Sequence, residues 1–268
     1  MDFLRHFHHE AAAFETALRG AADAPAPVVP TCPEWSLADL ALHLGVVHRF
    51  VTAVIAHGAG APPADVALSL DHPGLGIPAE HRDWPDPQRT PNTGPVPADL
   101  ADWFAAGAAA LEETLRTTDP AKTVWSWGAD GTAAFWTRMQ TIETAVHRWD
   151  AENALGAARP LPAELAADAV VQNFEVMAPA RRARRHLPPA AGERLRFRRT
   201  DGGGDWTAHF DGTEVRLAEG EGAGADVELA GTASDLALFL WQRVPADRLD
   251  VTGDRGVLDR YFDLAPPL

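Results

Sequence analysis

The segment between residues 135 and 156 constrains the fold most, because its apolar residues recur at the spacing of an amphipathic helix. These residues are Phe135, Met139, Ile142, Val146 and Trp149, and Gly156 follows as a typical helix stop. Glu143, His147 and Asp150 project roughly 60 to 120° around the helix axis from Phe135. We therefore expect a long helix that buries one face and holds these three polar side chains partly buried at its edge.

Glu143 and His147 leave the same face of this predicted helix, because they are four residues apart. Burying a carboxylate and an imidazole costs free energy unless a partner compensates both, and a divalent cation is a common partner for this pair. Two ligands on one rigid helix are half of a metal site. The alternative is a simple hydrogen bond between the two side chains on a solvated flank of the helix.

His43 supplies a candidate third ligand from a different segment. Ser36 and Asp39 have the spacing of a helix N-cap and its acidic partner, which predicts that a helix begins there. The apolar face of that helix comprises Leu37, Leu40, Leu44 and Val47. His43 lies between Leu40 and Val47 at helical spacing, so we expect its imidazole to point into the same core. The alternative is a core histidine whose ring is satisfied by a backbone carbonyl.

Two further helical patterns, at residues 3–18 and 100–115, bring the number of expected helices in this part of the chain to four. Antiparallel four-helix bundles often hold metal sites between facing helices. We therefore predict that residues 1–158 form a metal-binding bundle in which His43 on one helix faces Glu143 and His147 on another.

The remaining residues, 159–268, have a mixed pattern. A helical pattern covers residues 162–185, and short alternating segments at 194–199, 205–210, 213–217 and 226–230 predict three or four antiparallel strands. A further helix is expected over residues 234–242. The predicted fold class is therefore α+β, with a helical bundle followed by a smaller α+β domain.

A segment rich in Gly and Pro, from Gly58 to Pro97, is too long for an ordinary connection between two helices. We interpret it as a loop that roofs the metal site, with Leu75 and Trp84 as apolar anchors. The alternative is a disordered excursion on the surface.

The charge balance limits the partners. The chain has 38 acidic and 23 basic side chains, for a formal net charge of -15, and would be repelled by nucleic acid and by an anionic membrane surface. We therefore expect neither partner. One basic run at residues 181–186 opposes this trend, and we interpret it as the charged C-terminal end of a helix rather than an anion or nucleic-acid patch.

Cys32 is the only cysteine of the chain, so no disulfide or thiolate cluster can form within it. We expect a structural role for this residue, because a catalytic thiol would need an environment that lowers its pKa, and the sequence does not demonstrate one. Without an N-terminal apolar run or an apolar stretch of about 20 residues, the chain is predicted to be cytoplasmic and not membrane-bound. The sequence does not indicate an oligomeric state.

Three motifs carry a family resemblance. The pattern P-x-W-S-x-x-D-L-x-x-H at residues 33–43, followed by F-W-x-R at 135–138 and E-x-x-x-H-R-x-D-A at 143–151, resembles the mycothiol-dependent maleylpyruvate isomerase family. The resemblance continues through residues 205–207, 231–236 and 251–254. It implies a DinB-like four-helix bundle followed by a sterol-carrier-like α+β domain.

The resemblance also implies the chemistry. It implies that His43, Glu143 and His147 bind zinc, or another divalent metal, and that mycothiol, a low-molecular-weight thiol, is the cofactor. It further implies that Arg243, at the end of the helix expected over residues 234–242, binds a substrate carboxylate. Many members of the family read F-W-L-R-R-M-A-H-E before the ligand glutamate, whereas this chain has Met139 and Ile142 in place of an arginine and the histidine.

Three functions are compatible with these features. In the first, a zinc ion with an open coordination position activates mycothiol for attack on an electrophilic small molecule. The thiolate either adds to a cis double bond and leaves after rotation, which is isomerisation, or it stays on the product, which is S-conjugation. The second is a thiol-independent zinc enzyme of a specialised biosynthetic pathway. The third is a non-catalytic, metal-stabilised protein that binds a small molecule.

Overall fold

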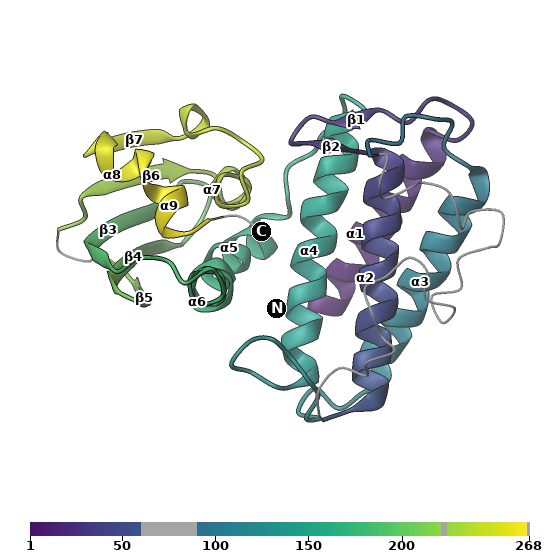
Figure 1. Cartoon of the computed structure of the whole chain (residues 1–268), viewed down its shortest axis with the longest axis horizontal. Helices are drawn as coiled ribbons and strands as arrows, with labels where there is room; N and C mark the ends of the chain where they lie inside the picture. The colour runs from purple at the N-terminus through teal and green to yellow at the C-terminus, as the bar shows by residue number, and fades with distance from the viewer. Residues whose placement is uncertain (60–89, 221–223, 267–268) are drawn as a thin grey trace. The chain divides into compact units, whose positions relative to one another are not determined.

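The computed structural model describes residues 1–59, 90–220 and 224–266 (Figure 1). The chain divides into two compact units, one formed by residues 2–159 and the other by residues 160–268 together with Met1. The first unit is helical and the second combines a sheet with helices, which confirms the predicted α+β fold class. Each unit is described by itself.

Within residues 2–59 and 90–159, the N-terminal unit contains four long helices, as the apolar spacing predicts (Figure 1). They are α1 Phe3–Gly20, α2 Leu37–His57, α3 Ala98–Thr117 and α4 Ala133–Ala154. A small antiparallel hairpin of β1 Val28–Val29 and β2 Cys32–Ser36 precedes α2, and β2 continues into that helix without a break.

Side-chain caps define where these helices begin. At α2, the Ser36 hydroxyl accepts a hydrogen bond from the Asp39 amide, and the Asp39 carboxylate accepts one from the Ser36 amide at 2.8 Å. This capping box confirms the predicted start of the helix. Thr132 caps α4 in a similar way, and α4 ends ahead of Gly156, whose φ of +72° suits glycine.

The bundle core is built from apolar side chains of all four helices. Phe14 of α1 packs on Phe104 of α3 with ring centroids 4.6 Å apart. Fully buried side chains on the first three helices include Phe7, Phe14, Leu18, Leu37, Leu40, Leu44, Ile55 and Phe104, and α4 adds Ile142 and Val146, each 2% exposed. Burial of each such side chain contributes about 1.5 to 3 kcal/mol, so this shared core is what fixes the ligand-bearing helices α2 and α4 in place.

A buried ion network ties α4 to α1. The Arg148 guanidinium, with 3% of its side chain exposed, donates to Glu10 of α1 at 2.7 Å and to Glu152 at 2.8 Å. Glu152 also accepts from Arg159, beyond the end of the helix. Burial alone would raise the pKa of Glu152, but the hydrogen bonds from Arg159 and Arg148 outweigh it and hold that pKa below its ordinary value. Glu152 therefore stabilises the fold at neutral pH and loses this effect in acid.

The C-terminal unit begins with a long, nearly continuous helical segment. It consists of α5 Ala163–Gln172, a π-helical turn at Asn173–Met177 and α6 Ala178–Arg185. The predicted helix at residues 162–185 is therefore present, with one wide turn in its middle. The expected helix at 234–242 is α7 Ala233–Leu240, and it ends two residues early because Gln242 has a φ of +57°.

A five-stranded sheet completes this unit, in the order β5-β4-β3-β6-β7. The strands are β3 Ala190–Arg199, β4 Asp205–Gly212, β5 Glu214–Glu219, β6 Val227–Gly231 and β7 Asp250–Gly253. The prediction of antiparallel strands alone was wrong, because β3 and β6 run parallel. The β4–β5 hairpin occupies one side of β3, so β6 pairs on its free side. The strand β7 was not predicted.

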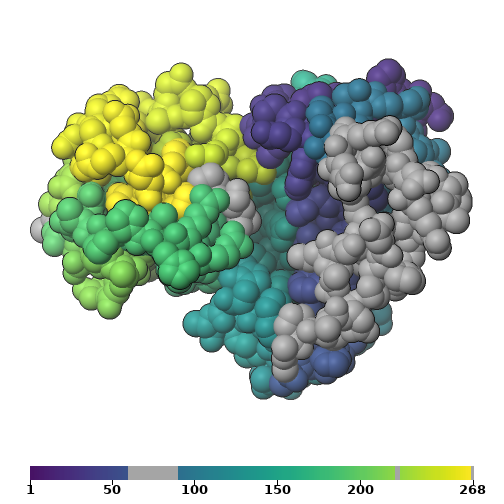
Figure 2. All heavy atoms as spheres, viewed as in Figure 1, coloured from purple at the N-terminus to yellow at the C-terminus, as the bar shows by residue number. Residues whose placement is uncertain are grey.

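Aromatic side chains form the core of the C-terminal unit. Phe197 of β3 and Phe210 of β4 pack around Phe174 of the π-helical turn and Tyr261. Tyr261 lies in the short helix α9 Tyr261–Leu264, which follows the short helices Ala246–Arg248 and α8 Arg255–Asp259. In Figure 2 the yellow C-terminal residues lie against the green α6 segment, and the Arg182 guanidinium donates to the Leu264 carbonyl at 2.7 Å.

The basic run at residues 181–186 ends α6, as interpreted from the sequence, since the helix stops at Arg185. It is not uniformly solvated, however. Arg181 and Arg182 are both 4% exposed, and Arg182 donates to the carbonyls of Pro188 and Gly212 at 3.0 Å as well as to Leu264. Half of this run therefore holds the C-terminal segment in place, while Arg184 and Arg185 are exposed.

The prediction that the chain has no apolar stretch of about 20 residues was wrong, because α2 is such a stretch. By length and composition it could cross a membrane, with a mean hydropathy of 1.4 in its best window, and it is the one such helix in the described part of the chain. Of that window, 61% is buried. The core helix of a bundle meets the same criteria as a membrane span, so this observation is weak by itself.

We predict that Arg148→Met destabilises the protein by about 3 to 5 kcal/mol, because it leaves the carboxylates of Glu10 and Glu152 buried without their shared guanidinium. Urea unfolding in the presence of a chelator measures this effect independently of any metal. The control is Arg19→Met, which removes an exposed guanidinium paired with Glu15 and Asp102 and should unfold near the parental midpoint. Equal midpoints for the two variants would contradict a stabilising role for the network.

Candidate metal centre

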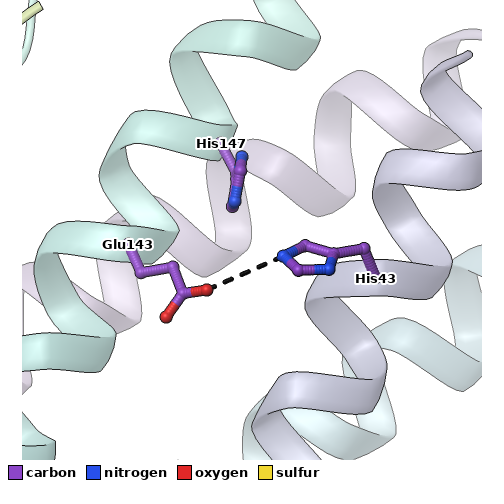
Figure 3. Close-up of side chains that lie close together, drawn as sticks. All are labelled: His43, Glu143 and His147. Carbon is purple, nitrogen blue, oxygen red and sulfur yellow. Dashed lines mark ion pairs between the residues drawn. The ribbon is translucent and has the colours of Figure 1, made fainter. Parts of the chain in front are cut away.

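The bundle brings His43, Glu143 and His147 together (Figure 3). His43 projects from α2 toward Glu143 and His147, which lie one turn apart on the facing side of α4. One nitrogen or oxygen atom from each residue lies within 4.8 Å of the others, and His43 Nε2 is 3.7 Å from Glu143 Oε1. The three residues proposed from the sequence therefore form one cluster.

The geometry of this cluster fits a divalent metal. Zinc–nitrogen and zinc–oxygen bonds of about 2.0 to 2.1 Å place tetrahedral ligand atoms roughly 3.4 Å apart. The 3.7 Å separation of His43 Nε2 and Glu143 Oε1 is close to that value and too long for a hydrogen bond. Two imidazole nitrogens and one carboxylate oxygen are also a typical ligand set for catalytic zinc.

The cluster lies at the edge of the core. The side chains of His43 and Glu143 are 34% and 25% exposed, whereas that of His147 is 11% exposed. The expectation that His43 points into the core was wrong. The core histidine of α2 is His48, which is 0% exposed. Five residues on an α-helix turn the side chain by about 140°, so His48 faces the interior when His43 faces the cluster.

Asp150 sets the orientation of His147. Its carboxylate is 0% exposed, and Oδ2 lies 3.0 Å from His147 Nδ1. With the proton on Nδ1 donated to this carboxylate, Nε2 carries the lone pair that would bind a metal, the usual arrangement for a ligating histidine. The sequence analysis included Asp150 among the partly buried polar residues, and the structure gives it this partner.

Glu143 is held from the opposite side by Gln140, whose Nε2 donates to Glu143 Oε2 at 2.9 Å. Burial alone would raise the pKa of Glu143, but the neighbouring His43 outweighs it, with smaller contributions from His147 and His48, and the pKa lies below its ordinary value. The carboxylate is therefore ionised at neutral pH, as a metal ligand must be. Sequence analysis overlooked Gln140, although its spacing of three residues from Glu143 places it on the same helix face.

His48 is a second residue that the sequence analysis missed. Its Nε2 lies 3.0 Å from the hydroxyl of Thr144, next to Glu143, and its ring packs between Phe7 and Phe104. Burial lowers the pKa of His48 to about 3, so this imidazole is neutral. It belongs to the packing behind the cluster.

Two other features singled out in the sequence are the apolar residues that precede Glu143 on α4 and the segment from Gly58 to Pro97. Met139 and Ile142 are buried, at 5% and 2% exposure. Most of the loop from Gly58 to Pro97, including Leu75 and Trp84, lies outside the described residues. Near its described end, Asn92 donates from its backbone nitrogen and its Nδ2 to Asp39, at 2.8 and 2.5 Å.

Arg243 lies in the C-terminal unit, three residues after α7 ends, and is partly exposed. Its Nη1 donates to the Trp241 carbonyl at 2.7 Å. Its proposed contact with a substrate carboxylate stays a prediction.

The chain is thus a four-helix bundle with a His-Glu-His cluster that could hold a metal, followed by an α+β domain. Comparison with protein families assigns both parts of the chain. Residues 4–152 match the mycothiol maleylpyruvate isomerase N-terminal domain, and residues 164–260 match the C-terminal domain of the same family. The chain therefore belongs to the mycothiol-dependent maleylpyruvate isomerase family, which is a family of enzymes, and the resemblance proposed from the sequence is confirmed.

Solved structures agree with this assignment at the level of the fold. A crystal structure of the mycothiol-dependent maleylpyruvate isomerase is 13% identical with a TM-score of 0.58, and it covers 94% of this chain and 92% of its own. A second crystal structure, of a histidine-to-alanine mutant, is 12% identical with the same TM-score and coverage. No curated protein matches the sequence significantly.

We predict that the purified protein carries about one divalent metal per chain, and that His43→Ala and His147→Ala abolish metal retention. Each variant removes one of three ligands, and two ligands hold zinc poorly. Elemental analysis after gel filtration measures the metal. His57→Ala, which changes an exposed histidine at the end of α2, is the matched control and should keep the metal. Full retention in both ligand variants would exclude this site.

A weaker effect is expected at Asp150. Asp150→Asn should lower metal affinity by about 10- to 100-fold without abolishing binding, because it acts on the orientation of His147 and is not itself a ligand. Competition with a chromophoric chelator measures the dissociation constant. An unchanged constant would show that the contact between Asp150 and His147 does not support metal binding.

Proposed function

We propose that the protein is a zinc-dependent enzyme that activates mycothiol for attack on an electrophilic small molecule, with isomerisation as the principal outcome and S-conjugation as the alternative. The observation that carries this proposal is the His43–Glu143–His147 cluster, in a chain whose two domains both match the mycothiol-dependent maleylpyruvate isomerase family.

The residues of the cluster have separate tasks in this proposal. Glu143 contributes the negative charge, and His147 presents Nε2 because Asp150 occupies its Nδ1 side. His43 and Glu143 are partly exposed, so a small molecule can reach the cluster from solvent. When bound, a zinc ion would supply the positive charge that keeps a thiol ionised at neutral pH.

Cys32 is the only cysteine in the sequence, and we propose that the nucleophile is an external thiol rather than this residue. Cys32 lies in β2, partly buried, ahead of α2. Its position in the hairpin is compatible with a structural role.

Arg243 is proposed to bind a substrate carboxylate, since a guanidinium can hold a carboxylate through two parallel hydrogen bonds. Burial lowers the pKa of Arg181 to about 10, and the positive charges of Arg184, Arg185 and Arg243 contribute to the decrease. Arg243 is therefore close enough to Arg181 for the two positive charges to interact.

A thiol-independent zinc enzyme is the second candidate. The observation that favours it is the apolar character of Met139 and Ile142, which replace basic residues present in many relatives. We expect the protein to act in the cytoplasm on a small molecule, without nucleic acid or membrane partners.

We predict that turnover of maleylpyruvate requires both mycothiol and the metal, and that Cys32→Ser retains most of the activity and metal content. The measurement is product formation with and without mycothiol, after chelation and after restoring zinc. A constant level of free thiol identifies isomerisation, and its stoichiometric loss identifies S-conjugation. Metal-dependent turnover without any thiol would favour the second candidate. A loss in Cys32→Ser as large as in His147→Ala would show that the nucleophile is misassigned.

For Arg243, we predict that Arg243→Ala lowers kcat/KM for an acidic substrate by about 10- to 1,000-fold, equivalent to about 1.4 to 4 kcal/mol, while the metal content stays unchanged. Arg243→Lys should recover only part of the activity, because an ammonium lacks the planar fork. The matched control is Arg248→Ala, an exposed arginine of the same segment. Parental kinetics in both Arg243 variants would remove this residue from the mechanism.

A further inference from the structure

The β1–β2 hairpin lies against both ligand-bearing helices. The strand β1 packs against α4, which carries Glu143 and His147, and β2 packs against α2, which carries His43. Figure 1 shows the hairpin across one end of these two helices. Because β2 continues into α2 through the Ser36 cap, the hairpin is in rigid connection with the helix of His43.

Thr31, at the tip of this hairpin, reaches the other ligand helix. Its hydroxyl donates to Asp150 Oδ1 at 2.9 Å, and the second oxygen of the same carboxylate lies 3.0 Å from His147 Nδ1. Thr31 and Asp150 are 119 residues apart in sequence. A continuous hydrogen-bonded chain therefore runs from the hairpin through Asp150 to the imidazole of His147.

Trp35 makes the corresponding contact on the α2 side. Its indole packs on the His43 ring, with centroids 4.7 Å apart and an interplanar angle of 46°. The rings of His43 and His147 are themselves 5.2 Å apart and almost perpendicular. The hairpin thus contacts the His43 ring directly, through Trp35, and is linked to His147 indirectly, through the Asp150 carboxylate.

We propose that Thr31 is a positioning residue for the metal centre, holding the Asp150 carboxylate in the rotamer that orients His147. The proposal rests on the metal site proposed above and extends it to a residue of the hairpin. Both oxygens of Asp150 are then engaged in fixed directions, one by the Thr31 hydroxyl and the other by His147.

The physical reason is conformational. A carboxylate can rotate about its last torsion, which is broad and roughly two-fold, so a single contact with His147 does not fix its plane. The hydroxyl of Thr31 restrains that torsion from the opposite side. A hydrogen bond to a charged group also contributes more than one between neutral groups. Thr31, in the turn between β1 and β2, therefore helps to set the direction in which the His147 lone pair points toward the cluster.

The test compares Thr31→Val, which removes the hydroxyl at constant shape, with Thr31→Ser, which retains it. Zinc affinity is measured by chelator competition, and Co²⁺ substitution reports ligand geometry through its visible absorption. Thr16→Val is the control, because Thr16 is exposed on α1 and its hydroxyl donates to a local carbonyl, that of Ala12. Urea unfolding of the metal-free proteins checks that all variants fold.

We expect Thr31→Val to bind zinc about 3- to 10-fold more weakly, less than the effect of replacing a direct histidine partner. Its Co²⁺ spectrum should shift in band position or intensity, and Thr31→Ser should restore both readouts. The proposal is overturned if Thr31→Val keeps the parental affinity and spectrum, or if Thr31→Ser is impaired to the same extent. Failure of the unaltered protein to bind either metal would instead refute the proposed metal site and, with it, this role.

Discussion

The rest of the N-terminal unit depends on the helix α4, because two consecutive residues of this helix take part in different interactions, the candidate metal cluster and the buried ion network. His147 faces the cluster with His43 and Glu143, whereas Arg148, the next residue, faces α1 and pairs with Glu10. One residue on an α-helix turns the direction of the side chain by about 100°, which separates the two sets. The buried ion network on one side therefore fixes the rotation of α4 and, with it, the direction of its metal-ligand side chains.

Much of the fold follows from local sequence. The four bundle helices were predicted because apolar spacing, Ser36 with Asp39, and Gly156 are all properties of neighbouring residues. The pairing of Glu143 and His147 was predictable for the same reason, since four residues on a helix return to one face. The convergence of His43 on them was proposed from a bundle arrangement and a family motif, and the structure brings the three together.

The remaining features depend on contacts between distant segments. Thr31 and Asp150, and Arg148 and Glu10, meet only after the helices pack, so neither pair has a signature in the local pattern. His43 was expected in the core because its spacing matches the apolar face of α2. The spacing alone does not show that this side of the face lies toward α4 and is partly exposed. The parallel pairing of β3 with β6 was likewise missed, since strand order is decided by which edge of β3 is free.

The π-helical turn at Asn173–Met177 has a consequence for the helical segment that contains it. A π turn holds an extra residue, so the faces of α5 and α6 are out of phase although the backbone continues without a break. Upstream, the inward face is apolar, with Leu165 and Val170. Downstream, the shifted phase turns Arg181 and Arg182 inward, where they donate to the carbonyls of Pro266 and Leu264. A single helical segment thus presents an apolar surface to α7 and a hydrogen-bond donor surface to the C-terminal segment, in the way that two separate helices usually would.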